Sequence, residues 1–248
     1  MKRFRASVTV ALALVGLWAA IGYTAPLRYP NLDEFTKEDA EKMEGAAAGS
    51  LAPVYGPLAE HLVDTFDLAD KAGIGIDLGS GPGTLIVELC KRTKMHWVNA
   101  DINPYFFPNF LKRAEEAEFA GRVSAVFADA QALPFKDAYA DVIVSRGSFW
   151  IWEDQRAAFS EIYRVLRPGG VAYVGRGFSE NLPVEVARAT REGSGQGKGG
   201  PPKYDLDETE AQLRAVMNSL LIKTYTIHRP APPGSEGVNY GIWLEIRK

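Results

Sequence analysis

The sequence predicts an α/β protein: a doubly wound, mostly parallel seven-stranded sheet with a carboxyl-terminal antiparallel hairpin, preceded by an amino-terminal hydrophobic helix. Three observations predict it. Short apolar segments alternate with amphipathic ones from residue 73 onward, the last two apolar segments have no helix between them, and a long uncharged run stands near the amino terminus. Alternating strands and helices form a parallel sheet with right-handed crossovers and helices on both faces.

The elements follow in a regular order along the chain. Strands are expected at 73–78, 96–101, 122–128, 141–145, 171–175, 222–228 and 238–246. Helices are expected where apolar residues recur at helical spacing, at 84–91, 104–119, 155–166 and 205–220. Two further helical stretches are expected at 36–43 and 50–68, the second broken or delayed by Pro53 and Pro57. The last two strands are expected to pair around the loop 230–237.

The composition is that of an ordinary globular protein. The chain has 248 residues, of which 46% are hydrophobic and 24% charged, and this excludes collagen-like and wholly disordered chains. A formal net charge of −3 provides no overall basic field for nucleic acid. Cys90 is the only cysteine, which excludes an intrachain disulfide framework and a cysteine-based zinc cluster. The three histidines lie far apart in sequence, so no metal site is expected.

Residues 1–27 form a segment apart from the fold. Basic residues precede a nearly uncharged run from Ala6 to Leu27. One interpretation is a signal anchor, because 6–25 is just long enough to cross a bilayer. The other is a signal peptide, cleaved near the small residue Gly22, which would leave the protein exported. The basic flank predicts a translocated body, which conflicts with the cytosolic cofactor inferred below, so the side of the membrane stays open.

A glycine-rich loop follows the first strand and opens a helix. It reads Asp77-Leu78-Gly79-Ser80-Gly81-Pro82-Gly83. Glycine lets a ligand approach the backbone closely, and the amides that begin a helix favour an anionic group. A dinucleotide fingerprint requires its third glycine at position 84, which is Thr84, so the pattern differs from that fingerprint.

Acidic residues end the next two strands. Asp101 lies 22 residues after Gly79, where a carboxylate can accept both hydroxyls of a ribose. Asp129 ends the third strand. Ligands of such sheets bind beyond the carboxyl ends of the strands, where these acids lie. Asp101 predicts a nucleoside without selecting one cofactor.

Together these motifs resemble those of class I S-adenosylmethionine-dependent methyltransferases, closest to the small-molecule type similar to quinone C-methyltransferases. The resemblance covers about residues 50–180 and includes Leu133-Pro134-Phe135 and Arg167-Pro168-Gly169-Gly170. It implies a Rossmann-like sheet, S-adenosyl-L-methionine as cofactor, and adenine recognition by Asp129. The chain then divides into 1–27, a helical segment at 28–72 and a methyltransferase domain at 73–248 with an inserted flexible loop at 182–203. The implied cofactor-binding residues are Asp77, Gly79, Gly81, Gly83, Asp101, Ile102, Asp129, Ala130 and Ser145.

The segment after the fourth strand, 145–154, lies beside the transferred methyl group in this family. It lacks the Asn/Asp-Pro-Pro-aromatic motif of amino-directed DNA and protein-glutamine methyltransferases, which disfavours nucleic acid as acceptor. Trp150 and Trp152 are expected to wall a flat apolar acceptor, to face the sulfonium, or to pack in the core. Arg146 and Arg176 are expected either to bind a carboxylate or phosphate of the acceptor, or to pair with nearby acids.

Methyl transfer to a small acceptor requires positioning of the reactants more than a fixed catalytic side chain. A general base is needed only if the acceptor carries a proton of high pKa. The candidates for that base are Glu153, Asp154 and Tyr55.

The sequence thus predicts a membrane-associated methyltransferase that acts on a small, apolar or amphipathic acceptor, which is a small molecule or lipid-like. Two alternatives remain: a non-catalytic module that binds S-adenosylmethionine, and a nicotinamide-dependent oxidoreductase. The oligomeric state is not predicted.

Overall fold

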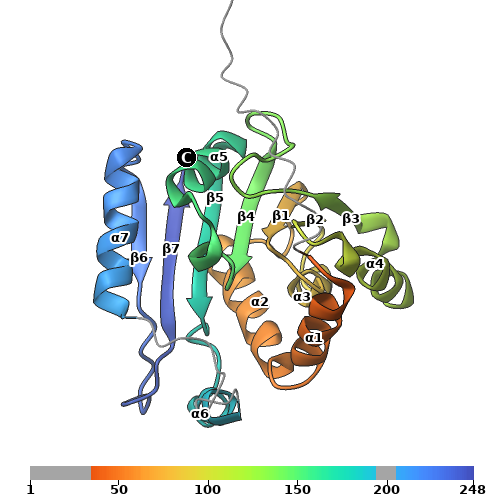
Figure 1. Cartoon of the computed structure of the whole chain (residues 1–248), viewed down its shortest axis with the longest axis horizontal. Coiled ribbons are helices and arrows are strands. Elements are labelled where there is room, and N and C mark those ends of the chain that lie inside the picture. Colours follow the sequence, from red (N-terminus) through yellow and green to blue (C-terminus); the bar gives the residue numbers. More distant parts are fainter. Residues whose placement is uncertain (1–34, 194–204) are drawn as a thin grey trace, which may run out of the picture.

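The structure is a computed structural model that describes residues 35–193 and 205–248. Within these residues, seven strands form one sheet in the order β3-β2-β1-β4-β5-β7-β6 (Figure 1). The strands are β1 (Ile74–Leu78), β2 (His96–Asp101), β3 (Val123–Phe127), β4 (Ala140–Arg146), β5 (Leu166–Gly177), β6 (Tyr225–His228) and β7 (Gly241–Arg247). Strands β1 to β5 are parallel, whereas β7 is antiparallel to both β5 and β6. The predicted doubly wound sheet and its carboxyl-terminal hairpin are therefore confirmed.

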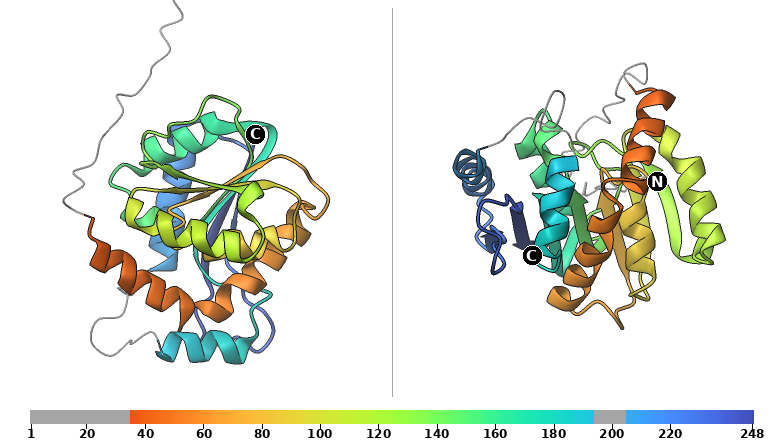
Figure 2. Two further views of the ribbon diagram at one scale, coloured as in Figure 1. Left: turned by 90° about the vertical axis from the view of Figure 1, so that its right-hand side faces the viewer. Right: turned by 90° about the horizontal axis from the view of Figure 1, so that it is seen from below.

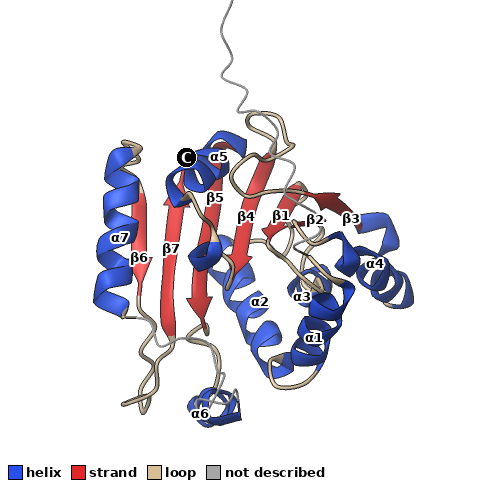
Figure 3. Ribbon diagram, viewed as in Figure 1, coloured by secondary structure: helices blue, strands red, loops and turns tan. Residues whose placement is uncertain are grey.

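Helices cover both faces of the sheet (Figures 2 and 3). They are α1 (Lys37–Ala48), α2 (Ala52–Phe66), α3 (Thr84–Cys90), α4 (Phe107–Glu116), α5 (Gln155–Val165), α6 (Val184–Gly193) and α7 (Leu206–Ser219), with short 3-10 turns η2 (Pro104–Phe106), η3 (Ala120–Arg122) and η4 (Phe149–Ile151). One core cluster joins the sheet to α5 and α7, and a second joins it to α2, α3 and α4. Burial on both faces explains why the centre of β4 is the apolar run Val142-Ile143-Val144.

The order in which successive strands are added to the sheet reverses between β1 and β4. From β1, the chain order runs outward to β2 and β3 on one side and to β4 and β5 on the other. The register aligns Asp101, the last residue of β2, with Phe127, the last residue of β3. The carboxyl ends of β1, β2, β3 and β4 therefore meet at one edge, which is the usual ligand position of such sheets.

Three elements differ from the sequence prediction. Helix α2 continues through Pro57, and Pro53 occupies its first turn, where a missing amide costs nothing. Strand β5 begins at Leu166 and not at the expected Val171, because Leu166 pairs with Ala140, and the register of the β4–β5 pairing shifts between Ala140 and Val142. Inside the expected loop 182–203, residues Val184–Gly193 form helix α6.

The hydrophobic amino-terminal segment 1–27 lies outside the described residues. Within 35–193 and 205–248, the structure contains no helix with the length and apolar character needed to cross a membrane. The helical segment expected at 28–72 is described from Phe35 onward, where it forms α1 and α2.

Candidate active site

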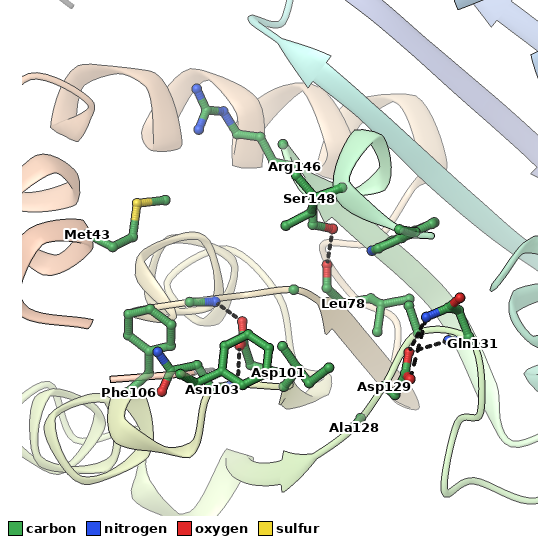
Figure 4. A pocket seen from close by; sticks show the side chains of 18 of the residues that line it. Met43, Leu78, Asp101, Asn103, Phe106, Ala128, Asp129, Gln131, Arg146 and Ser148 are labelled. Atoms are coloured by element: carbon green, nitrogen blue, oxygen red, sulfur yellow. Dashed lines mark hydrogen bonds between the residues drawn. The ribbon is translucent and has the colours of Figure 1, made fainter. Parts of the chain in front are cut away.

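A cavity of about 800 Å³ opens at the edge where the parallel strands end (Figure 4). Its lining comes from the glycine loop, the ends of β2, β3 and β4, and helix α1. The lining residues are Phe35, Met43, Leu78, Gly79, Gly81, Asp101, Ile102, Asn103, Phe106, Ala128, Asp129, Ala130, Gln131, Arg146, Gly147, Ser148, Ile151, Trp152 and Glu153. The volume lies within the range of about 300–1,000 Å³ typical of small-molecule sites.

The glycine loop passes close beneath the cavity. Gly79 has φ +66°, and a Cβ there would lie 2.5 Å from the Cβ of Ser148, so a side chain is excluded on both counts. Gly81 has φ +55°, but its Cβ would meet nothing closer than 3.9 Å, on Met43 and Phe106. The open side of Gly81 therefore faces the cavity and forms a cradle that a side chain would fill.

Asp101 connects the end of β2 to this loop. Its Oδ2 accepts the amide N–H of Gly81 at 2.7 Å, and its Oδ1 accepts the amide N–H of Asn103 at 2.8 Å (Figure 4). Burial raises the pKa of Asp101, and these backbone hydrogen bonds oppose the shift. Each carboxylate oxygen retains a lone pair, so the pair of oxygens can still accept hydroxyl groups from the cavity.

Asp129 holds the corresponding position after β3. Its Oδ1 accepts the backbone N–H of Gln131 at 2.9 Å and the side-chain amide of Gln131 at 3.1 Å. The Gln131 side-chain oxygen in turn accepts the backbone N–H of Asp154 at 2.8 Å. These bonds fix the carboxylate at the cavity wall opposite Met43 and Phe106 (Figure 4).

Asp77 lies behind the loop rather than in the cavity lining. It is 3% exposed, and its Oδ2 accepts the hydroxyl of Ser80 at 2.7 Å. Burial raises the pKa of Asp77 to about 7, and the carboxylate of Asp101 adds to the shift, whereas the Ser80 hydroxyl and the charge of Arg146 oppose it. With a pKa of about 7, Asp77 changes charge near neutral pH while it supports the glycine loop from behind.

Two other residues expected to contact the cofactor also lie behind the lining. Ser145 is buried, and its hydroxyl shares a 2.6 Å hydrogen bond with the hydroxyl of Ser148, which faces the cavity. A Cβ on Gly83 would lie 2.2 Å from the Phe110 ring, so this glycine serves helix packing beneath the loop. Both positions support the lining without forming part of it.

Arg146 ends β4 and lines the cavity on the side of α2. Its Nε donates to the carbonyl oxygen of Gly177 at 3.2 Å, and its guanidinium carbon lies 5.3 Å from the centre of the Tyr55 ring. Tyr55 is buried outside the lining, and burial raises its pKa while the charge of Arg146 lowers it. A raised pKa and a position outside the lining make Tyr55 a poor base for a bound acceptor.

The two tryptophans expected beside the acceptor have different surroundings. Trp152 lines the cavity and also packs edge-on against Phe159 of the core, with ring centres 5.6 Å apart. Trp150 lies outside the lining, is 43% exposed, and stacks beneath the guanidinium of Arg176 at 4.6 Å. Trp152 therefore lines the cavity, whereas Trp150 pairs with Arg176 outside the lining.

Glu153 and Asp154, two candidate bases that are adjacent in sequence, occupy different surroundings. Glu153 lines the cavity. Asp154 instead caps helix α5, because its carboxylate accepts the amide N–H of Ala157 at 2.9 Å. The Asp154 carboxylate therefore lies at the helix start, and Asp154 is not among the cavity-lining residues.

The sequence-based prediction did not include several lining residues. Phe35, Met43, Asn103, Phe106, Gln131 and Ile151 were not expected there. Asn103 and Gln131 each stand two residues after a predicted strand-end aspartate, and that spacing is a usable signal for a side chain or amide that holds the carboxylate. Met43 and Phe106 reach the cavity only because α1 packs across η2, which periodicity does not reveal.

The assembled site is acidic at one end and mainly apolar at the other. Asp101 and Asp129 can accept hydrogen bonds from a sugar and a base, and the Gly81 cradle can admit a thin polar chain. Ile151, Trp152 and Arg146 face the remaining space. The lining therefore fits a nucleoside with an extended tail, with room for a second molecule beside it.

Comparison with known proteins gives the same family by sequence and by structure. A family model described as a methyltransferase domain matches residues 76–174. A solved protein of Methanococcus maripaludis, assigned as an S-adenosyl-L-methionine-dependent methyltransferase, superposes with a TM-score of 0.71 at 30% identity and covers 86% of this chain and 94% of its own.

Curated relatives match over shorter lengths. The chloroplast 2-methyl-6-phytyl-1,4-hydroquinone methyltransferase 2 of Oryza sativa subsp. japonica is 37% identical over 116 residues, which is 46% of this chain and 32% of that protein. The human mitochondrial arginine-hydroxylase NDUFAF5 is 30% identical over 165 residues, which is 64% of this chain and 46% of that protein. The chain thus spans about a third to a half of the length of these relatives.

Proposed function

Because the chain belongs to the class I S-adenosylmethionine-dependent methyltransferases, we propose that it transfers a methyl group from S-adenosylmethionine to a small, apolar or amphipathic acceptor. One observation supports this proposal most strongly. The glycine loop and the strand-end carboxylates of Asp101 and Asp129 line a single cavity at the carboxyl edge of the parallel sheet. A nucleoside cofactor and an acceptor can both enter that cavity.

The cofactor occupies the acidic end of the cavity in this proposal. Asp101 accepts hydrogen bonds from the two ribose hydroxyls. Backbone amides of Gly81 and Asn103 hold its carboxylate oxygens in place for this contact. Asp129 accepts a hydrogen bond from the adenine amino group, and Ile102 and Ala130 lie beside the ring. The Gly79 to Gly81 stretch leaves room for the methionine tail.

The acceptor occupies the end formed by β4 and η4. Ile151 and Trp152 give this end an apolar lining, and Arg146 adds a positive charge. Bound S-adenosylmethionine supplies a methyl group on a positively charged sulfur, which becomes a neutral thioether once the methyl group has moved to the acceptor. The protein holds the reacting atoms in line and excludes water, while Glu153 is placed to take a proton from an acceptor that must lose one.

The curated relatives support the choice of acceptor class. The relative from Oryza sativa is named for a phytyl-bearing hydroquinone, and a relative from Vibrio vulnificus, 33% identical over 97 residues, is named for C-methylation in ubiquinone and menaquinone biosynthesis. Both names refer to quinone-type compounds, whose flat ring suits a cavity walled by Trp152 and Ile151.

We also propose that the protein works at a membrane. The run from Ala6 to Leu27 is nearly uncharged and long enough for the hydrocarbon region. An apolar acceptor would concentrate in the same phase. Protease accessibility of residues 35–248 in intact and opened vesicles tests this placement and identifies the side of the membrane, and the mass of the mature amino terminus shows whether the run is removed.

The cofactor site is tested by calorimetric titration of S-adenosylhomocysteine into Asp101→Asn and into the control Asp64→Asn. Asp64 is exposed on α2, away from the cavity lining. A hydrogen bond to a charged acceptor contributes about 1.5–3 kcal/mol, so Asp101→Asn weakens binding roughly 10- to 100-fold, and the control leaves it unchanged. Equal affinities for the two variants would contradict the assigned site.

Transfer itself is tested with methyl-labelled S-adenosylmethionine and extracted membrane lipids. Label in a lipid product supports the proposal. The alternative is a module that binds the cofactor without transfer, or one that supports another reaction, as the name of the human relative shows for a related chain. Tight cofactor binding with no labelled product from lipids or from total metabolites would favour that alternative.

A further inference from the structure

Exposed apolar side chains surround the opening of the cavity. Met43 is 40% exposed, Tyr105 49%, Trp150 43% and Ile151 61%. Met43 and Ile151 line the cavity as well. These four residues are called the mouth patch below.

The other two members of the mouth patch are fixed beside the lining. Trp150 donates its indole N–H at 2.9 Å to the carbonyl oxygen of Gly147, which is a lining residue. Tyr105 belongs to η2, directly before the lining residue Phe106. The whole mouth patch therefore lies at the carboxyl edge of the sheet.

Exposed large hydrophobic residues are concentrated there. Within the described part of the chain, only Leu111 and Leu221 share this degree of exposure outside the mouth patch. Leu221 precedes β6, which runs in the same direction as β5, so Leu221 lies at the opposite edge of the sheet. Single exposed hydrophobic residues are ordinary, but a group around a cavity opening is typical of a binding surface.

The composition of the mouth patch suits the boundary between lipid and water. Tyrosine and tryptophan combine an apolar ring with a polar atom and are enriched at membrane interfaces. The Arg176 guanidinium lies 4.6 Å from the Trp150 ring centre, so a cation accompanies the indole ring of the group. Arginine can keep its charge in the headgroup region while its stem covers apolar surface.

The chain also limits how far this opening can lie from the apolar amino-terminal run. Only residues 28–34 separate Leu27, the end of that run, from Phe35, which lines the cavity. A fully extended chain spans at most about 3.6 Å per residue, so the connection reaches no further than about 29 Å. A bilayer that holds the run therefore lies close to the cavity opening.

We propose that the mouth patch docks on the surface of a lipid bilayer, so that the acceptor enters the cavity directly from the lipid. This inference rests on the proposed membrane-associated function and adds the orientation of the domain. Interfacial side chains of this kind enter a bilayer by about 5–10 Å, to the boundary between headgroups and acyl chains. The substrate class it implies is a lipid-soluble molecule whose reactive group lies near that boundary.

Site-directed fluorescence tests the orientation in the full chain. An environment-sensitive thiol probe is placed singly at Tyr105→Cys, at Trp150→Cys and at the control Leu221→Cys, so that three mouth-patch residues remain in each test variant. The native Cys90 is 2% exposed, and burial raises its pKa to about 11, which leaves the introduced thiol as the reactive one. Each protein is bound to phosphatidylcholine vesicles that carry a nitroxide at a shallow acyl position.

The expected result is a roughly twofold loss of emission for probes at positions 105 and 150, because insertion by about 5–10 Å brings them to the nitroxide, and none at 221. Absence of quenching at 105 and 150, equal quenching at 221, or failure to bind the vesicles would each overturn the inference. Titration of S-adenosylhomocysteine into the same proteins is a separate readout, and its failure in the wild-type chain would count against the proposed function instead.

Discussion

Asp77 and Asp101 place two carboxylates close together beneath the glycine loop. Both are buried, and the charge of Asp101 contributes to the raised pKa of Asp77. Between the ordinary value of 3.8 and about 7, the folded protein keeps a proton on Asp77 that the unfolded chain has released. The free energy of unfolding therefore falls as pH rises through this window and levels off above it.

Replacing Asp77 by Asn removes this pH dependence and leaves an acceptor for Ser80. The gain in unfolding free energy of Asp77→Asn over wild type is expected to grow from about pH 4 to about pH 7, by about 1.4 kcal/mol for each unit of pKa shift at most. Urea denaturation across this pH range measures it, with Asp64→Asn as the control. A difference that does not change with pH would show that Asp77 ionises normally.

Gly79 and Gly121 form a matched pair of glycine sites. Gly79→Ala combines φ +66° with a Cβ only 2.5 Å from Ser148, whereas a Cβ on Gly121 meets nothing within 4 Å. Gly79→Ala is expected to cost about 1–2 kcal/mol from the backbone alone, and to weaken S-adenosylhomocysteine binding at least tenfold as the loop shifts. Gly121→Ala should stay within about 0.5 kcal/mol.

Thermal unfolding and calorimetric titration of both proteins check this prediction. If the two substitutions had the same effect on binding, the loop conformation would not be what admits the cofactor.

The sequence predicts the site residues that directly follow strand ends. It does not predict those that reach the cavity only because their element packs against another. Gly81, Asp101 and Asp129 were predicted because a strand, a loop and an acid recur at fixed intervals. Met43 contributes only through the position of α1 against η2, a contact between distant segments that no local pattern encodes. Asp154 was a candidate base because it lies in the segment after the fourth strand, yet its carboxylate caps helix α5.

At the scale of elements, helix α5 depends on Asp154 for its start. Loss of an N-cap costs about 0.5–2 kcal/mol, and Asn caps as well as Asp. We therefore expect Asp154→Ala to lower the free energy of unfolding by about 1 kcal/mol and Asp154→Asn to preserve it. Denaturant titrations measure the difference.

The same two variants address catalysis. Asp154→Asn should retain methyl transfer, because its carboxylate touches the helix and not the cavity. Loss of transfer in a stable Asp154→Asn protein that still binds S-adenosylhomocysteine would return Asp154 to the role of base.

Strand positions follow from the sequence more closely than connections do. The predicted strand 96–101 matches the bounds of β2, in which every residue after His96 is buried. The early start of β5 depends on a long-range pairing with Ala140, and α6 follows a proline in a segment whose glycine content suggested a loop. Such contacts form only when the sheet is assembled, so local composition does not reveal them.

Over the whole molecule, the sheet provides a rigid frame and the segments beyond its carboxyl edge provide the chemistry. The β1–β4 boundary places the glycine loop between two acids and the apolar end formed by η4. The opposite edge carries Leu221 and no part of the cavity lining. The proposed cofactor and the proposed apolar acceptor would therefore both enter from the carboxyl edge of the sheet.

A crystal structure of the chain with S-adenosylhomocysteine tests the central claim most directly. We predict both ribose hydroxyls within hydrogen-bond distance of the Asp101 carboxylate, adenine beside Asp129 and Ala130, and the amino-acid tail over Gly81. A ligand bound outside this cavity, or one with its ribose turned away from Asp101, would contradict the account.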